Sequence, residues 1–280
     1  MIIFATAWYI FKAKFEVTVY QKWIKNLLTN AKNVKIVIFT NVESKWVIEP
    51  FLQPEVNEYS KNIKMVILEI EEFYGYKYKT EWINNHTENH ALNNRVEWKV
   101  NMLWNEKVAF VKRVVENNYF SLTPSEEEQL SWVGWCDIGY FRGGDNNMNV
   151  YKLKEWAHDE ALNRLNVNNI YYTQICGDDL LNQLKFIKRS ENPSTNSIIY
   201  MNPILAYIAG GFFLVNKKNI QWWYDTYYSL LKCYFTNNCL VKDDQIIIMN
   251  CIINHPERFE LITEKNKYFD PWFAFGHYLL

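Results

Sequence analysis

The segment "SWVGWCDIGYFRGGD", residues 131–145, places a carboxylate where a buried strand should end. Asp137 follows the apolar run "WVGWC", which has the composition of a strand in a protein core. A carboxylate in this position could hold a divalent cation that bridges two phosphates, because hard cations prefer oxygen ligands. It could equally accept backbone N–H groups in the turn that follows. The local sequence leaves both interpretations open.

Lys107 is the second candidate, because it lies in the apolar stripe of a helix predicted over residues 95–118. A lysine in such a stripe must either extend its ammonium to the edge of the apolar surface or find an anion. A phosphate would be such a partner, although extension to the edge is the more common arrangement. The apolar residues around it are Leu103, Trp104, Val108 and Val111.

Two pairs of adjacent residues later in the chain are further candidates. Gly210 and Gly211 lie in the predicted strand "IAGGFFLV", where glycine is costly unless a ligand or another backbone approaches closely, or the strand carries a β-bulge. Asp243 and Asp244 begin the predicted helix "DDQIII". One carboxylate could cap that helix, which leaves the other to act as a base or to hold hydroxyl groups.

The histidines give no metal motif of their own. His277 stands in the aromatic tail "DPWFAFGHYLL", where a surface histidine is the simplest interpretation. The other four show no ligand spacing, which argues against a site made of histidines alone: His86, His90, His158 and His255.

Strand and helix patterns alternate along the chain, and this predicts an α/β fold in one domain over residues 1–280. The strand patterns are continuous apolar runs, typical of a mostly parallel sheet covered by helices on both faces. Residues 143–200 are less regular and contain one predicted strand. The predicted strands are 1–7, 33–40, 62–70, 132–136, 170–176, 208–215 and 259–262, and the predicted helices are 16–30, 95–118, 219–235 and 243–253.

Polar residues stand where three of these strands are predicted to end: Thr6, Asn41 and Asp137. Ligands of open α/β sheets bind at the carboxyl ends of strands, near a switch in strand order. We therefore expect the three side chains to share one rim of the sheet and to border a ligand cleft.

Composition excludes several classes of protein. Of the 280 residues 49% are hydrophobic, so the chain can bury a large core, and 30 basic against 31 acidic residues give a net charge of −1, which argues against nucleic-acid binding. Five cysteines without a C-x-x-C pair favour a reducing compartment, and "MIIFATAWYIF" predicts a buried strand and not a leader or a membrane span. These features predict a cytoplasmic protein without a membrane span. Motifs of serine hydrolases, P-loop enzymes and dinucleotide-binding folds do not occur.

The order of these motifs resembles that of nucleotide-sugar glycosyltransferases with the GT-A fold, most closely the HtrL/YibB-like family. The matching segments are "FATAWY", "VIFTN", "WNEK", "WVGWCDIGYFRG", "IAGGFFLV", "DDQIII" and a late histidine. Similar domains occur in large DNA viruses. The resemblance spans nearly the whole chain, but each motif is short and only their order is specific. It implies transfer of a sugar from a nucleoside diphosphate sugar, expected to be a UDP-sugar, to a glycan or protein hydroxyl. It also implies Mn²⁺ or Mg²⁺, and the host cytoplasm if the protein is viral.

The resemblance also implies roles for individual residues. Asp137 corresponds to the first aspartate of the D-x-D motif, which contacts the metal and the donor ribose, and His277 to a histidine that completes the metal site. Lys107 is expected to reach the donor. The donor's base and ribose are assigned to Thr6, Ala7 and Asn41, the donor sugar to Gly210 and Gly211, and the transferred sugar and acceptor to Asp244 and Gln245, with Asp243 or Asp244 as the base.

One departure weakens the metal assignment. The second position of the D-x-D motif is Gly139, and Asp145 is a poor substitute because two glycines separate it from the strand end. Two other functions stay open. A sugar nucleotidyltransferase would share the architecture but usually has a glycine-rich basic loop after its first strand, where this chain has "ATAWYIF". A non-catalytic nucleotide- or glycan-binding module would use the aromatic residues alone.

Overall fold

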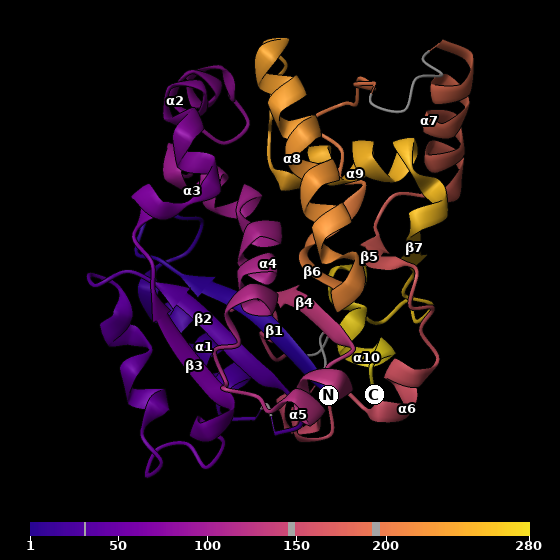
Figure 1. The fold of residues 1–280 in the computed structure, drawn as a ribbon. Coiled ribbons are helices and arrows are strands. Elements are labelled where there is room, and N and C mark those ends of the chain that lie inside the picture. Colours follow the sequence, from indigo (N-terminus) through magenta and orange to yellow (C-terminus); the bar gives the residue numbers. More distant parts are fainter. Residues whose placement is uncertain (31, 145–148, 192–196) are drawn as a thin grey trace.

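The chain folds around one seven-stranded sheet with strand order β3-β2-β1-β4-β6-β5-β7 (Figure 1). The computed structural model describes residues 1–30, 32–144, 149–191 and 197–280. Each predicted strand is present, with these bounds: β1 Ile2–Trp8, β2 Lys35–Thr40, β3 Ile63–Ile67, β4 Trp132–Cys136, β5 Ile170–Gln174, β6 Ile208–Asn216 and β7 Phe259–Ile262. This confirms the predicted α/β fold with a mixed, mostly parallel sheet. The boundary of a single domain at 1–280 stays a prediction.

Helices cover both faces of the sheet, because alternate residues of each strand point to opposite sides. Ile3 and Ala5 of β1 belong to a core that includes residues of α4, α8 and α9, whereas Ile2 and Phe4 pack in a second core with α1 and α10. The helices are α1 Val17–Leu28, α2 Lys79–Glu88, α3 Trp98–Asn105, α4 Lys107–Asn117, α5 Pro124–Gln129, α6 Asp159–Asn163, α7 Asp178–Glu191, α8 Ile220–Thr236, α9 Asp244–Asn254 and α10 Phe275–Tyr278.

The helix predicted over residues 95–118 is in fact two helices, α3 and α4, which separate at Glu106. The Glu106 carboxylate is fully buried and accepts hydrogen bonds from the backbone N–H groups of Tyr74 (2.6 Å) and Gly75 (3.0 Å). Burial raises the pKa of Glu106 to about 8. The apolar pattern continues across the break because it records which side chains face the core, not where the helical hydrogen bonds stop. The break places Lys107 in the first turn of α4.

Other helices differ from the sequence-based expectation as well. The region predicted to be irregular contains α7, whose apolar residues Leu181 and Leu184 are buried among polar ones. In α1 the buried stripe includes Trp23 and Leu27 as expected, but Val19 is 37% exposed. Val19 stands near the start of α1, before the turns that pack on the sheet.

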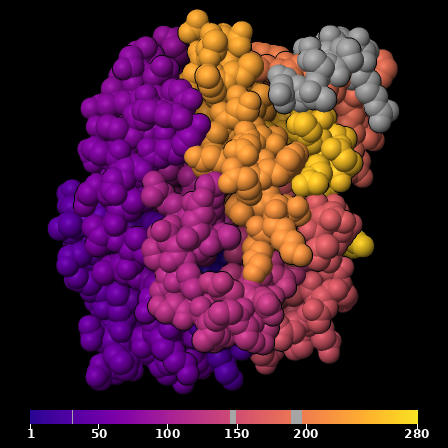
Figure 2. Space-filling model, in the orientation of Figure 1, coloured from indigo at the N-terminus to yellow at the C-terminus, as the bar shows by residue number. Residues whose placement is uncertain are grey.

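β6 is the one strand of the sheet that runs against its neighbours, since it pairs antiparallel with both β4 and β5. Its first residues therefore lie at the edge where the other strands end. The backbone N–H of Asp137, directly after β4, donates to the carbonyl of Gly211 near the start of β6 (2.8 Å). In the space-filling view, earlier residues gather on the left and later residues in the centre and on the right, in contact along the visible face (Figure 2).

Candidate functional site

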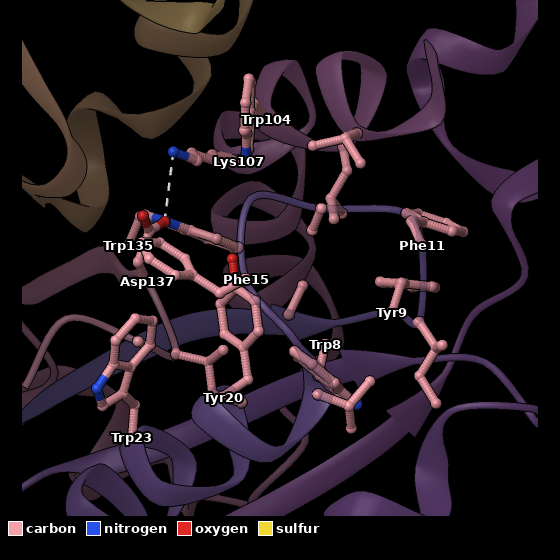
Figure 3. A pocket seen from close by; sticks show the side chains of 18 of the residues that line it. Trp8, Tyr9, Phe11, Phe15, Tyr20, Trp23, Trp104, Lys107, Trp135 and Asp137 are labelled. Atoms are coloured by element: carbon pink, nitrogen blue, oxygen red, sulfur yellow. Dashed lines mark hydrogen bonds and ion pairs between the residues drawn. The ribbon is translucent and has the colours of Figure 1, made fainter. Parts of the chain in front are cut away.

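A cleft opens at the carboxyl edge of the sheet, where the segments after β1 and β4 meet. β2 flanks β1 on one side and β4 on the other, so the strand order reverses here, as at ligand clefts of open α/β sheets. The cleft has two adjoining parts. The aromatic half, about 870 Å³ with its open mouth, has eight aromatic residues in its lining: Trp8, Tyr9, Phe11, Phe15, Tyr20, Trp23, Trp104 and Trp135 (Figure 3).

The charged half of the cleft, about 850 Å³ with its open mouth, adjoins the aromatic half and shares Lys107, Asp137 and Arg142 with it. It brings together residues that are distant in the sequence. Its polar and glycine residues are Lys14, Lys107, Asp137, Arg142, Gly210, Gly211, Asp243, Asp244, Gln245 and Asp270. Seven of the predicted site residues therefore lie together, and Ala7 lines the aromatic half.

Lys107 is the centre of the charged half. Its Nζ donates to the carbonyl of Gly210 (2.8 Å) and lies 2.9 Å from Asp244 Oδ2 and 3.3 Å from Asp137 Oδ1. Figure 3 shows Lys107 and Asp137 pointing toward each other. Burial alone would lower the pKa of Lys107, but the two carboxylates outweigh it and raise that pKa. The ammonium therefore has one hydrogen bond, to the backbone of β6, and two ion pairs, with the carboxylates of Asp137 and Asp244.

Asp137 is held from two sides but stays open to the cleft. Its Oδ1 also accepts a hydrogen bond from Trp135 Nε1 (2.5 Å), and its side chain is 39% exposed. Trp135 and Asp137 stand two residues apart around the end of β4, so the strand itself sets this contact. The carboxylate is therefore fixed in direction while one edge faces solvent.

Gly210 and Gly211 allow two carboxylates to lie against β6. A Cβ atom on Gly210 would come within 2.8 Å of Asp244 Oδ2, and one on Gly211 within 3.2 Å of Asp137 Oδ2. The pairing of β5 with β6 also shifts register at this place, between Tyr171 and Thr173. Both interpretations of the glycines therefore apply, since the strand is irregular and side chains approach it closely.

The sequence predicted that one of Asp243 and Asp244 caps α9 and that the other is spare, but neither side chain caps this helix. Asp243 occupies the N-cap position of α9, but its side chain makes no capping hydrogen bond and lies 3.3 Å from Lys242 Nζ. Asp243 Oδ1 is buried and has no hydrogen-bond partner within the described part of the chain. Asp244 is 3% exposed, and burial raises its pKa to about 6 although Lys107 acts in the opposite direction.

Three buried asparagines hold the residues that precede this pair. Asn85 exchanges two hydrogen bonds of 2.8 Å with the backbone N–H and carbonyl of Val241. Asn89 and Asn101 donate to the carbonyl of Lys242, at 2.9 and 3.2 Å. The sequence analysis missed this support, because side-chain contacts between α2, α3 and the segment before α9 leave no local signal.

Two predicted nucleotide contacts do not line the cleft. Thr6 is fully buried, because β1 continues to Trp8 and Thr6 is not at its end. Asn41 does follow β2, but it is buried and its Oδ1 accepts a hydrogen bond from the backbone N–H of Ser44 (3.0 Å). Its side chain stabilises a turn. Of the three residues expected to border the cleft together, only Asp137 does so.

The predicted metal pair of Asp137 and His277 is not brought together as lining residues of this cleft, and a metal held by the two stays a prediction. His277 Nδ1 lies 3.4 Å from Glu264 Oε2, and its ring lies against that of Phe269 with centroids 3.9 Å apart and a tilt of 34°. It lines neither half of the cleft. Asp137 Oδ1 contacts Lys107 and Trp135, so Oδ2 is the carboxylate oxygen that remains for another ligand. Among residues 1–30, 32–144, 149–191 and 197–280, no three histidine, cysteine or acidic side chains form a metal-binding group. Asp145 lies outside the described residues.

The glycine in place of a second D-x-D aspartate has a packing reason. A Cβ atom on Gly139 would come within 2.8 Å of Cε3 in the Trp23 ring. Trp23 is 8% exposed and cannot move aside without opening the core. A carboxylate at this position is incompatible with the aromatic half as it is built.

Lys14, Arg142 and Asp270 line the charged half but were not singled out by the sequence analysis. The position of Arg142, shortly after the strand end at Asp137, is the sequence feature that could have identified it as a residue of the cleft. The aromatic tail packs on the core, since Phe273 and Phe275 are buried and the Phe275 ring stacks on Phe212 with centroids 4.4 Å apart.

Comparison with protein-family models and with curated proteins gives no match. Among solved structures, the chain is similar to the galactosyltransferase LgtC in complex with donor and acceptor sugar analogs, with 12% identity and a TM-score of 0.47 over 93% of this chain and 73% of that one. An active-site mutant of LgtC gives 11% identity and a TM-score of 0.46, over 98% and 83%. Similarity at this level assigns neither a family nor an activity to the chain. In the described residues, no helix is long and apolar enough to cross a membrane.

Proposed function

We propose that this chain is a glycosyltransferase that moves a sugar from a nucleoside diphosphate sugar, a UDP-sugar in particular, to a hydroxyl group of a glycan or a protein. The observation that carries the proposal is the cleft itself. An aromatic half suited to stacking a base or a sugar ring adjoins a charged half with carboxylates and cations, at the switch in strand order between β1 and β4.

The charged half supplies the groups that glycosyl transfer requires. The reaction passes through an oxocarbenium-like state while the diphosphate leaves with growing negative charge, and the acceptor hydroxyl must lose a proton. Asp244, with a pKa of about 6, is ionised at neutral pH and still basic enough to take that proton. The unpartnered Asp243 Oδ1 is available to accept a hydrogen bond from a sugar hydroxyl.

Lys107 has a positioning role in this proposal. Its ammonium fixes Asp137 and Asp244 against β6, so the carboxylates are held in place before any ligand arrives. Preorganised charges are more effective in catalysis than charges that must first reorient. The bond from Trp135 adds to the same effect at Asp137.

Two other functions are distinguished by one set of measurements. The protein is incubated with a panel of nucleotide sugars, and released nucleoside diphosphate is measured with and without sugar acceptors, for the natural chain and for Asp244→Asn. We expect release from one donor that an acceptor accelerates and that Asp244→Asn abolishes. Formation of pyrophosphate from a nucleoside triphosphate and a sugar phosphate would identify a nucleotidyltransferase. Glycan binding without any turnover would identify a binding module.

A further inference from the structure

Lys107 was expected to meet the donor phosphates, but its ammonium is buried and lies against three oxygens of the protein. It donates to Gly210 O at 2.8 Å and forms ion pairs with Asp244 Oδ2 at 2.9 Å and Asp137 Oδ1 at 3.3 Å. Two carboxylates already balance this charge, so cations of the charged half that face no carboxylate are better candidates to bind a diphosphate. The charged half contains two more cations, Lys14 and Arg142, and neither forms an ion pair with a carboxylate in the part of the chain that the structure describes.

We propose that Arg142 and Lys14 together bind the diphosphate of the ligand, in the place that the sequence analysis assigned to a metal held by Asp137 and His277. This inference rests on the proposed function and adds the binding residues for the anionic part of the donor. Lys14 stands in the segment after β1 and Arg142 in the segment after β4, so the two cations come from the two adjacent strands at which the strand order switches.

Arg142 is preorganised for such a contact. Its guanidinium carbon lies 4.5 Å from the centroid of the Trp23 ring, 5.1 Å from that of Phe273 and 5.6 Å from that of Phe15. Its Nε donates to the carbonyl of Gly139 (3.2 Å), which fixes one edge of the planar group. The remaining N–H groups of a guanidinium held in this way can bind two phosphate oxygens at once, with little loss of side-chain entropy.

Lys14 is less tightly held, and its ammonium lies 4.9 Å from the centroid of the Trp104 ring. Trp104 lines both halves of the cleft, so the contact keeps the ammonium beside the boundary between them. A lysine acts as a point charge and does not fix phosphate geometry. We therefore expect Arg142 to contribute more to affinity than Lys14.

Calorimetric titration with UDP and with inorganic pyrophosphate, each in EDTA and in Mn²⁺, tests the assignment. We expect both ligands to bind in EDTA, and Arg142→Gln to weaken both about 10–100-fold, the loss typical of one charge-assisted contact. Arg142→Lys should lower the affinity for both ligands by a smaller factor, and Lys14→Gln by a factor that is smaller still. The control Arg164→Gln removes an exposed arginine on the far end of α6 and should change nothing. Urea unfolding of each variant shows whether the fold is intact.

The outcomes separate this inference from the proposed function. UDP that binds only with Mn²⁺, with equal affinity for the natural chain and Arg142→Gln, would overturn the inference and leave a glycosyltransferase standing. If neither UDP nor pyrophosphate binds in EDTA, the inference is overturned as well. Pyrophosphate binding that depends on Arg142, without binding of any nucleotide or nucleotide sugar, would support the anion site and contradict the proposed function.

Discussion

The two halves of the cleft are built in different ways. Most of the aromatic half comes from one stretch of chain, the end of β1, the segment after it and α1, and its rings pack mainly on one another: Phe15, Tyr20 and Trp23 are mutual neighbours with centroids 5.1–6.1 Å apart. The charged half takes residues from segments that only the sheet topology brings together. Contacts between residues close in sequence form the aromatic half, whereas the charged half depends on the antiparallel strand β6, which lies beside the end of β4.

This difference makes the halves unequal under mutation. A ring on a partly exposed wall can be removed at the cost of its own contacts. A buried charge cannot, because its partners are left without compensation, and that penalty commonly exceeds the net contribution of the ion pair. The charged half should therefore respond to mutation as one unit, and the aromatic half residue by residue.

The largest effect is expected for Lys107→Ala. It leaves the buried Asp244 carboxylate and the Gly210 carbonyl without their partner, and we expect the free energy of unfolding in urea to fall by about 3–5 kcal/mol. The matched control is Lys112→Ala on the same helix, whose partner Glu116 is half exposed, with an expected loss of about 0–1 kcal/mol. Equal losses in the two variants would contradict the view of Lys107 as the centre of the charged half.

Gly210→Ala probes the same half without removing a charge. The new Cβ atom would approach Asp244 Oδ2 to 2.8 Å, so the carboxylate must move, and we expect a loss of about 1–3 kcal/mol together with reduced turnover. In Gly177→Ala, the control, the added atom meets nothing within 4 Å. If both variants unfold at the same urea concentration and turn over alike, close packing of Asp244 on β6 is not required.

The pH dependence of turnover tests Asp244 as the base. Since burial raises its pKa to about 6, its carboxylate is lost below that pH, and we expect kcat/KM to fall about tenfold per unit below pH 6 and to level off above it. Stability changes in the opposite sense: the folded state binds this proton more tightly than the unfolded chain, so the contribution is full below the ordinary aspartate pKa of 3.8 and is lost as the pH rises through 6. Asp159→Asn, an exposed control, should keep the profile, whereas a flat profile from pH 5 to 8 would exclude Asp244 as the base.

The smallest effect on folding is expected in the aromatic half. Phe15 is 43% exposed, so Phe15→Ala should change the free energy of unfolding by less than about 1 kcal/mol. If the ring stacks on the base of the donor, UDP affinity should still fall by the equivalent of about 1–3 kcal/mol. Calorimetry with pyrophosphate is the comparison, because a ligand without a base should lose only what the contact of Phe15 with Arg142 contributes, and therefore less than UDP. A large loss of stability would mean that the two halves do not differ in the way described above.

The sequence predicted the sheet well because apolar runs mark strands that are covered on both faces. It also predicted Lys107, Asp137 and Asp244 as site residues, since each is a charged residue in an apolar setting or at an element end. The structure brings these three side chains together, and their roles stay predictions. It could not place Thr6 correctly, because the end of β1 depends on its pairing with β2. It could not show that His277 meets Glu264 or that Asn85 holds Val241, because such contacts depend on where distant segments come to lie.

A crystal structure with a bound nucleoside diphosphate tests the central claim most directly, since it shows at once where the base and the phosphates lie. The account predicts the base in the aromatic half, near Phe15 and Trp104, and the phosphates in the charged half beside Arg142, with Lys107 still bound to Asp137 and Asp244. A nucleotide bound outside the cleft, for example in the separate hollow beside Val114 and Phe120, would contradict it.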